Sequence, residues 1–246
     1  RLLRSSGGRV MQGPFAGMHY FDEDLGSFLW PKLVGHYFDE RFKSLLWPKL
    51  LGTYEVELAE RLETWLRVTF ATVLVAGAAE GYYAVGLALR CRQAKVIAWE
   101  SNARARAALR SMAERNAVTD RLEIRGHCDP ESLLSALAMP GPVLLLLDVE
   151  GDEVAMLEAA APSAFADVHL LVETHDFISA GTTEKIERRL APTHVVERIE
   201  QAPRDLKLLS GLSIPTRFHY QAQYLMDEKR SSPENRWLAC TPRATR

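Results

Sequence analysis

Residues 73–83 read Val73-Leu74-Val75-Ala76-Gly77-Ala78-Ala79-Glu80-Gly81-Tyr82-Tyr83, and this stretch decides the fold. The apolar residues predict a buried strand, and the two glycines allow a sharp turn that brings the backbone close to a ligand. The residues to about 90 predict a helix whose first N–H groups point into the same crevice. A second apolar run, 96–99, ends at Glu100, where a carboxylate can accept hydrogen bonds from ribose hydroxyls. We therefore predict a nucleoside-cofactor site over residues 76–81.

The spacing of the small residues indicates which kind of cofactor binds. A dinucleotide fold has the pattern G-x-G-x-x-G, whose third glycine lets the helix pack on the strand. Here small residues recur at 77, 79 and 81, and Tyr82 follows them. This spacing disfavours a nucleotide-dependent oxidoreductase, and the alternative without a ligand is that the loop is only a tight turn.

Acidic side chains follow two further predicted strands. Residues 143–147 are five consecutive apolar residues, typical of a strand buried on both faces, and Asp148-Val149-Glu150-Gly151-Asp152-Glu153 come next. The strand at 168–172 leads into Glu173-Thr174-His175-Asp176. Because open α/β sheets bind ligands at the carboxyl ends of their strands, we expect these side chains to meet at one edge.

These motifs together resemble the FkbM-type branch of the class I S-adenosylmethionine-dependent methyltransferases. The resemblance rests on Gly77-Ala78-Ala79-Glu80-Gly81, Glu100-Ser101-Asn102, Leu147-Asp148-Val149-Glu150-Gly151 and Val172-Glu173-Thr174-His175. It implies a Rossmann-like, doubly wound α/β fold with a mostly parallel seven-stranded sheet. It also implies S-adenosylmethionine as cofactor and methyl transfer as the activity, which we expect to be O-methylation of a small molecule or sugar.

The resemblance also implies roles for particular residues. His175, past the end of a central strand, is the first choice for the base that takes the proton of an acceptor hydroxyl, and Glu173 and Asp148 are next. For His175 the alternative is a surface loop histidine, and for Glu150 and Glu153 it is a helix N-terminal acid. Asp129 is also a candidate N-cap for a helix beginning at Pro130. The expected cofactor-binding residues are Gly77, Ala78, Ala79, Glu80, Gly81, Tyr82, Glu100, Ser101, His127, Cys128 and Asp148.

One position departs from the pattern of the class I enzymes. They carry an acid two residues before the first loop glycine, where it helps to hold the cofactor's amino group, and this chain has Val75 there. Either another carboxylate such as Asp148 makes that contact, or binding is weakened, or the domain no longer catalyses. The second hypothesis is therefore a non-catalytic cofactor-binding or assembly module derived from a methyltransferase.

A metal site is a further alternative at the acidic edge. Asp148, Glu150, Glu173 and His175 are an oxygen-rich set that suits magnesium or calcium. Nothing in their spacing requires an ion, and we assign no metal.

The composition is that of an ordinary globular domain. The chain has 246 residues, 47% of them hydrophobic and 25% charged, with a net charge of −2, which argues against nucleic acid as the main partner. The three cysteines show no disulfide or zinc spacing, and no apolar run is long enough to span a bilayer. We expect a cytoplasmic protein with a small-molecule acceptor and no membrane partner.

The N-terminal region contains a tandem duplication. Residues 19–35 and 36–52 each run from His-Tyr-Phe-Asp-Glu to Leu-Trp-Pro-Lys-Leu. We divide the chain into an N-terminal extension, 1–70, and a methyltransferase domain, 71–246. Each copy is expected to be a short helix ending in a turn, with helix disfavoured at the tryptophan before proline. The exposed aromatic residues favour a homodimer through this extension, and the alternative is an extra copy that is simply looped out.

In the rest of the chain, predicted strands alternate with predicted helices. Expected strands lie at 72–76, 95–99, 122–125, 143–148, 168–173, 194–199 and 236–241, and expected helices at 81–91, 102–117, 130–138, 152–160, 182–190 and 218–230. Such alternation predicts a parallel sheet covered on both faces.

Overall fold

The computed structural model describes residues 7–20, 40–210, 212, 225, 226, 228 and 236–243. Each of the seven predicted strands is confirmed. The elements are α4 (Glu40–Leu51), η2 (Val56–Leu58), α5 (Ala59–Trp65), β1 (Thr72–Ala76), α6 (Tyr82–Arg90), β2 (Lys95–Trp99), α7 (Ala103–Arg115), β3 (Leu122–Arg125), α8 (Pro130–Leu137), β4 (Val143–Leu147), α9 (Glu153–Glu158), η3 (Pro162–Phe165), β5 (Val168–Thr174), α10 (Thr182–Leu190), β6 (His194–Ile199), η4 (Leu206–Leu209) and β7 (Arg236–Pro242).

The strands form one seven-stranded sheet in the order β3-β2-β1-β4-β5-β7-β6. Strands β1 to β5 pair in parallel with one another. β7 lies between β5 and β6 and runs antiparallel to both. This confirms the predicted Rossmann-like, mostly parallel fold. Every residue of β1 and β4 is buried, which explains why these two strands are apolar throughout and do not alternate.

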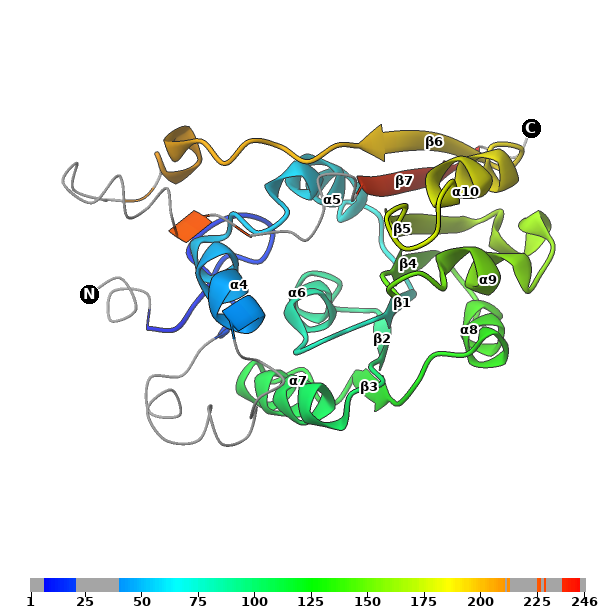
Figure 1. Ribbon diagram of the computed structural model, residues 1–246. Coiled ribbons are helices and arrows are strands. Elements are labelled where there is room, and N and C mark those ends of the chain that lie inside the picture. The colour runs from blue at the N-terminus through cyan, green and yellow to red at the C-terminus, as the bar shows by residue number, and fades with distance from the viewer. Residues whose placement is uncertain are drawn as a thin grey trace.

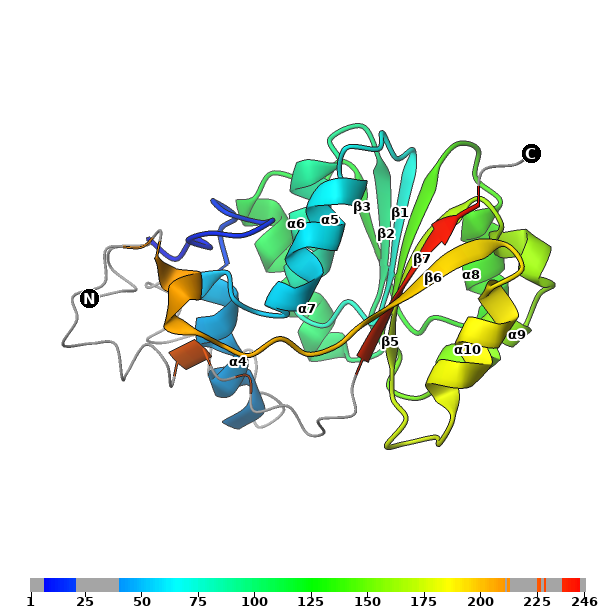
Figure 2. The same ribbon diagram turned by 90° about the horizontal axis from the view of Figure 1, so that it is seen from above.

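Helices cover both faces of the sheet. α5, α6 and α7 lie on one face and α8, α9 and α10 on the other (Figures 1 and 2). Successive side chains of β1 therefore enter different cores: Val73 and Val75 pack in the cluster under α6, and Leu74 and Ala76 pack in the cluster on the opposite face.

The loop after β1 depends on its first glycine. Gly77 has φ +84°, and a Cβ atom on it would lie 1.6 Å from the carbonyl oxygen of Asp148. Gly81, with φ +106°, begins α6 at a point where a Cβ would lie 2.4 Å from Leu109. Both positions thus favour glycine for its conformation, as the sequence indicates, and Gly77 also requires it for space because its neighbour is backbone.

Residues 40–51 of the second copy form α4, residues 36–39 lie outside the described residues, and one expectation about this copy is wrong. The helix does end in a turn, at Gly52 with φ +70°, but it passes through Trp47 and Pro48 without stopping at the tryptophan. A proline biases the residue before it away from helix without excluding helix. Here the last turn is held by tertiary contacts, because Leu50 is buried and its carbonyl accepts the N–H of Met11 at 2.8 Å. Residues 21–35 of the first copy lie outside the described residues.

The N-terminal segment is joined to the glycine loop by a buried ion pair. The carboxylate oxygen Oε1 of Glu80 accepts hydrogen bonds from the Lys49 ammonium at 2.5 Å and from the Tyr20 hydroxyl at 2.8 Å. Tyr20 belongs to the first copy and Lys49 to the second, so residues of both copies meet on one side chain. Whether residues 1–70 form a separate unit, and whether they carry a dimer contact, stay predictions.

The predicted C-terminal helix and the predicted lack of a membrane span concern the remaining segments. The helix predicted at 218–230 lies outside the described residues except for Leu225 and Met226, which are helical, and Glu228. Within the described part of the chain, no helix is both long enough and apolar enough to cross a lipid bilayer.

Gly77→Ala tests the contact between the glycine loop and β4. We expect a loss of about 3 kcal/mol or more in the free energy of unfolding, measured by chemical denaturation, because the new Cβ would overlap the Asp148 carbonyl. Gly181→Ala is the matched control, since Gly181 has φ +77° but open space around it, and should cost only about 1–2 kcal/mol. Equal losses in the two variants would contradict the account.

Lys49→Met tests the buried ion pair. Removing the ammonium leaves the Glu80 carboxylate buried beside Tyr20 alone, so we expect a loss of roughly 3–5 kcal/mol in unfolding free energy. The double variant Lys49→Met/Glu80→Gln removes both charges and should recover most of that loss. A double variant as unstable as the single one would show that charge burial is not the cause.

Candidate cofactor and active site

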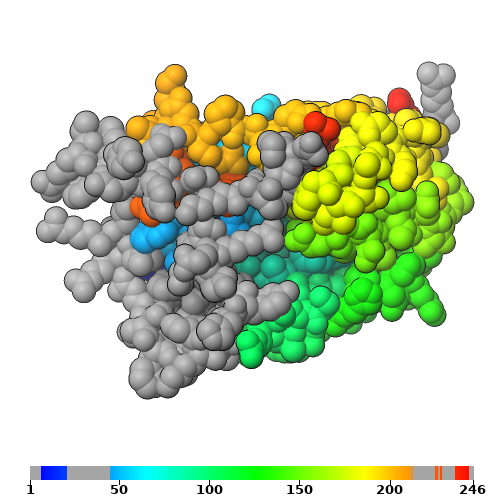
Figure 3. Space-filling view, in the orientation of Figure 1, coloured from blue at the N-terminus to red at the C-terminus, as the bar shows by residue number. Residues whose placement is uncertain are grey.

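The candidate site lies at the carboxyl ends of β1, β2, β4 and β5. In the space-filling view the teal chain in the middle of the molecule lies deeper than α7 and α10 (Figure 3). The parallel pairing of β1 with β2 and β4, and of β4 with β5, brings the ends of these four strands to one edge. The loop after β1, Glu100 after β2 and the acidic residues after β4 and β5 are thereby neighbours.

Glu100 faces the glycine loop. Its Oε2 accepts the N–H of Ala79 at 2.8 Å, and its Oε1 accepts the N–H of Asn102 at 2.7 Å. Ala79 has φ +47°, an unusual conformation for a residue with a Cβ, and the bond from its N–H helps to maintain it. Each carboxylate oxygen has a further lone pair, so the Glu100 carboxylate can also accept ribose hydroxyls.

Two residues of the loop point away from its open side. The Glu80 side chain is taken up by Lys49 and Tyr20, as described above. Tyr82 is buried, and its ring packs edge-on against Phe15 at 5.3 Å and Tyr54 at 5.4 Å. Sequence reasoning expected both as cofactor-binding residues, but their side chains contact the N-terminal segment because that segment supplies a cation and aromatic rings.

The other expected cofactor residues are placed as follows. Ser101 is exposed beside Glu100, and its carbonyl accepts a hydrogen bond from Arg106 at 2.7 Å. His127 is exposed, whereas Cys128 is buried in the core, where burial raises the pKa of its thiol to about 12. Asp129 caps α8 by accepting the N–H of Ser132 at 2.7 Å, which confirms the N-cap interpretation.

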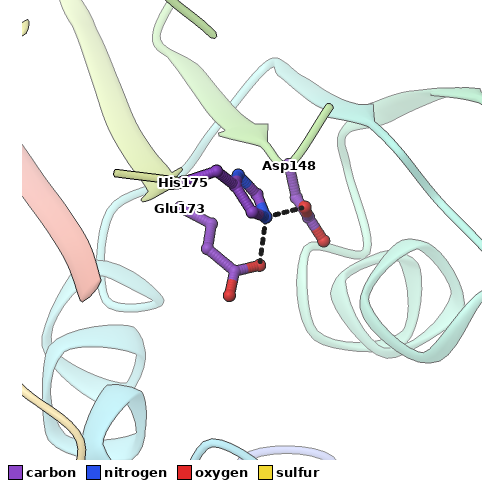
Figure 4. A group of neighbouring side chains, drawn as sticks. All are labelled: Asp148, Glu173 and His175. Carbon is purple, nitrogen blue, oxygen red and sulfur yellow. Dashed lines mark ion pairs between the residues drawn. The ribbon is translucent and has the colours of Figure 1, made fainter. Parts of the chain in front are cut away.

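His175 lies among four acidic side chains, of which Glu153 and Glu173 are buried, Asp148 is partly buried and Glu150 is exposed. The His175 side chain is 2% exposed, which excludes the surface-loop alternative, and its Nδ1 lies 2.7 Å from Oε1 of Glu153. Its Nε2 lies 3.6 Å from Glu150, 3.7 Å from Asp148 and 3.9 Å from Glu173. Asp148 at the end of β4 and Glu173 and His175 at the end of β5 point toward one another (Figure 4).

The sequence did not show that Glu153 belongs to this cluster. It begins α9, as the helix N-terminal interpretation requires, but it is fully buried and accepts the N–H of Gly151 at 3.0 Å as well as contacting His175. In the sequence, Glu153 is recognisable only as an acid between a central strand and the following helix. That position does not reveal that its partner, His175, follows the next strand.

The electrostatics of the cluster follow from burial and crowding. Burial by itself would lower the pKa of His175, but the hydrogen bond and charge of Glu153, with the charges of Glu173 and Glu150, raise it above its usual value. Burial would raise the pKa of Glu153, but the bonds from His175 and Gly151 lower it. Burial, then Glu150 and Glu55, raise the pKa of Asp148 to about 8. The cluster therefore favours the charged forms of His175 and Glu153 and the protonated form of Asp148, relative to the same groups in water.

The same atoms have the spacing of a metal-ligand set. One ligand atom from each of Asp148, Glu173 and His175 lies within 4.8 Å of the other two. The Nδ1 of His175 faces Glu153, so Nε2 is the nitrogen that would face an ion. A divalent cation would have to displace the protons of this cluster to bind, and our assignment of no metal stays a prediction.

Comparisons with known proteins show the fold. No protein-family model matches the chain, and no curated protein matches its sequence. A crystal structure of an assigned rRNA-methylase from Clostridium thermocellum is similar with a TM-score of 0.50 at 12% identity, over 76% of this chain and 95% of that one. This chain thus shares the Rossmann-like fold of that methylase, with a mostly parallel seven-stranded sheet.

Two further solved structures are similar at lower scores. A SAH-bound methyltransferase of Podospora anserina has a TM-score of 0.44 at 15% identity, covering 72% of this chain and 92% of that one. An assigned O-methyltransferase of Klebsiella pneumoniae has 0.47 at 10% identity, covering 72% and 86%.

Glu153→Gln tests the pair with His175 through pH. The raised pKa of His175 contributes stability that is present below pH 6.5 and is lost as the pH rises through that raised value. The lowered pKa of Glu153 contributes stability that is lost as the pH falls from about 4.5 through the lowered value. We therefore expect the variant to lose about 1.5–3 kcal/mol near pH 5–6.5 and progressively less toward pH 9.

Thermal melting across this pH range measures the effect. Glu158→Gln, an exposed position on the same helix, is the control and should match the wild type at every pH. A deficit in Glu153→Gln that stays constant or grows toward pH 9 would contradict the charged pair.

Proposed function

We propose that this protein is an S-adenosylmethionine-dependent methyltransferase of the FkbM-like type, acting in the cytoplasm on a hydroxyl oxygen of a small molecule or sugar. The observation that carries the proposal is the bond from the N–H of Ala79 to Glu100, which holds an acid against a glycine loop at the ligand-binding edge of a methyltransferase fold. The cofactor is S-adenosylmethionine.

The residues present fit this cofactor. Gly77 approaches the Asp148 carbonyl so closely that the turn at 76–81 lies down on the end of the sheet, and no side chain of residue 77 stands over it. Glu100 would accept the ribose hydroxyls, and the backbone of residues 77–81 would lie under the adenosyl amino acid. The described loop residues 77–81 include no cation that could bind a pyrophosphate. The lysine that contacts the loop, Lys49, is paired with Glu80.

The cofactor supplies, when bound, a methyl group on a positively charged sulfur. The residues of the chain have to align the acceptor oxygen with that group and exclude water. The ends of β4 and β5 lie beside the loop, so the space in front of His175 and Asp148 is where an acceptor would be held.

His175 is the residue proposed to receive the acceptor's proton. Its Nε2 faces the cluster while Glu153 fixes the ring through Nδ1. His175 accepts a proton only in its neutral form, so the rate should rise as the pH rises through its raised pKa. Asp148, whose pKa of about 8 lies near the working pH, is the second candidate for the same task, and Glu173 would anchor the acceptor.

The second candidate is a cofactor-binding module without catalysis. Val75 favours it, because the side chain two residues before the first loop glycine is fully buried and apolar. This candidate predicts cofactor binding without turnover. An RNA acceptor is disfavoured by the net charge of −2.

Glu100→Ala tests the cofactor site. Loss of a charge-assisted hydrogen bond to the ribose should weaken binding of S-adenosylhomocysteine by about 1.5–3 kcal/mol, as measured by isothermal titration calorimetry. Arg106→Ala is the control. The Arg106 guanidinium donates hydrogen bonds to the backbone carbonyls of Glu100 and Ser101 and leaves the Glu100 carboxylate untouched. An unchanged affinity in Glu100→Ala would remove the ribose assignment, and no binding to wild type would remove the cofactor.

Turnover separates the two candidate functions. Release of S-adenosylhomocysteine is to be measured with separate pools of phenols, polyols, sugars and RNA. Transfer to a hydroxyl compound supports the enzyme, transfer to RNA alone contradicts the acceptor class, and binding without transfer to any pool supports the module.

A further inference from the structure

The position at which an acid is expected carries no charge in this chain. Val75 is fully buried, pairs in the sheet with Ala98 and Leu146, and packs in the apolar cluster under α6. The cofactor's amino-acid part nevertheless carries an ammonium group, and a buried ammonium needs a carboxylate or comparable acceptor. Another residue near the loop must therefore supply it.

Glu55 of the N-terminal segment has the right location. Its side chain is buried, with the residue only 4% exposed, and its Oε2 accepts the hydroxyl of Tyr83. Tyr83 lies in the first turn of α6, the helix that follows the glycine loop, and its ring packs 6.3 Å from that of Trp237. Trp237 pairs in the sheet with Glu173, so a chain of contacts leads from the Glu55 carboxylate through Tyr83 and Trp237 to the end of β5.

The backbone at Glu55 is held in an uncommon conformation. Its φ of 45° and ψ of 45° are left-handed, which costs a residue with a Cβ roughly 1–2 kcal/mol. The conformation is maintained by a hydrogen bond from its N–H to Oε1 of Glu228 at 2.9 Å. Such strain persists only where the surroundings impose it, and it is concentrated at functional sites. Here it accompanies an acid whose carboxylate contacts α6, the helix that follows the glycine loop.

The charge of Glu55 also reaches the other side of the loop. It is among the causes that raise the pKa of Asp148, after burial and Glu150. Asp148 is the residue whose carbonyl packs against Gly77, so the charge of Glu55 acts on the residue against which the bend is held. A positive group between them would lower the energy of both carboxylates.

We propose that Glu55, supplied by the N-terminal segment, binds the ammonium group of the cofactor's amino-acid part in place of an acid at position 75, and that Tyr83 positions its carboxylate. The inference rests on the proposed function and adds a residue to it. It also gives the N-terminal segment a direct part in the site, because that segment then completes the cofactor pocket.

The test compares two ligands that differ in the ammonium-bearing part. S-adenosylhomocysteine carries it, whereas 5′-methylthioadenosine has the adenine, ribose and sulfur without the amino acid. We expect Glu55→Gln to weaken binding of S-adenosylhomocysteine roughly 10- to 100-fold and binding of 5′-methylthioadenosine less than about twofold, by calorimetry.

The outcomes separate this inference from the proposed function. If wild type binds neither ligand, the cofactor assignment fails. If wild type binds both and Glu55→Gln weakens both equally, or neither, the cofactor assignment stands and the role of Glu55 is overturned. Glu57→Gln is the matched control, a buried acid in the same segment that pairs with Arg204 at 2.9 Å, and should leave the ratio of the two affinities unchanged.

Two more variants keep the test decisive if Glu55→Gln does not fold. Tyr83→Phe keeps the charge but removes the bond that orients it, so a loss of roughly 3- to 10-fold confined to S-adenosylhomocysteine is expected, and an equal effect on both ligands contradicts the role. Val75→Asp in the wild-type background should change the affinity by less than about threefold. A gain of about tenfold or more would mean that the ammonium lacks a partner in wild type and would overturn the inference.

Discussion

The site depends on the close contact between the bend after β1 and the end of β4. Gly77 lies so near the Asp148 carbonyl that no side chain fits between them, and the Asp148 N–H in turn donates to the carbonyl of Ala76 at 3.0 Å. This contact places the glycine loop beside the acids of β4 and β5. The N–H of Ala79 then reaches Glu100 at the end of β2. One backbone contact thus brings a candidate ribose acceptor and a candidate proton acceptor to the same edge.

The N-terminal segment is built into this edge. Lys49 and Tyr20 reach the buried Glu80 in the loop, Phe15 packs on Tyr82, and Glu55 reaches Tyr83. A charged side chain inside the loop would be costly to bury unless a cation came with it, and Lys49 is that cation. The glycine loop and the N-terminal segment therefore stabilise each other.

Most of the fold was predictable from sequence because its signals are local. The apolar run 143–147, the glycines of the loop and the alternation of strands and helices each report on their own segment, and the structure confirms them. The convergence of Asp148, Glu173 and His175 followed from the rule that parallel strands end at one edge. What sequence could not give were contacts between distant segments. The burial of His175 against Glu153, the turning of Glu80 toward Lys49 and the continuation of α4 through Pro48 are all set by tertiary packing.

The most direct test of the central claim is a crystal structure of the protein grown with saturating S-adenosylhomocysteine. The account predicts the ribose hydroxyls within hydrogen-bonding distance of Glu100, the amino-acid part over the bend at 76–81 and the sulfur facing the space before His175. A ligand bound elsewhere, or a bend that stays closed over the sheet with Glu100 contacting only Ala79 and Asn102 at saturating ligand, would contradict it.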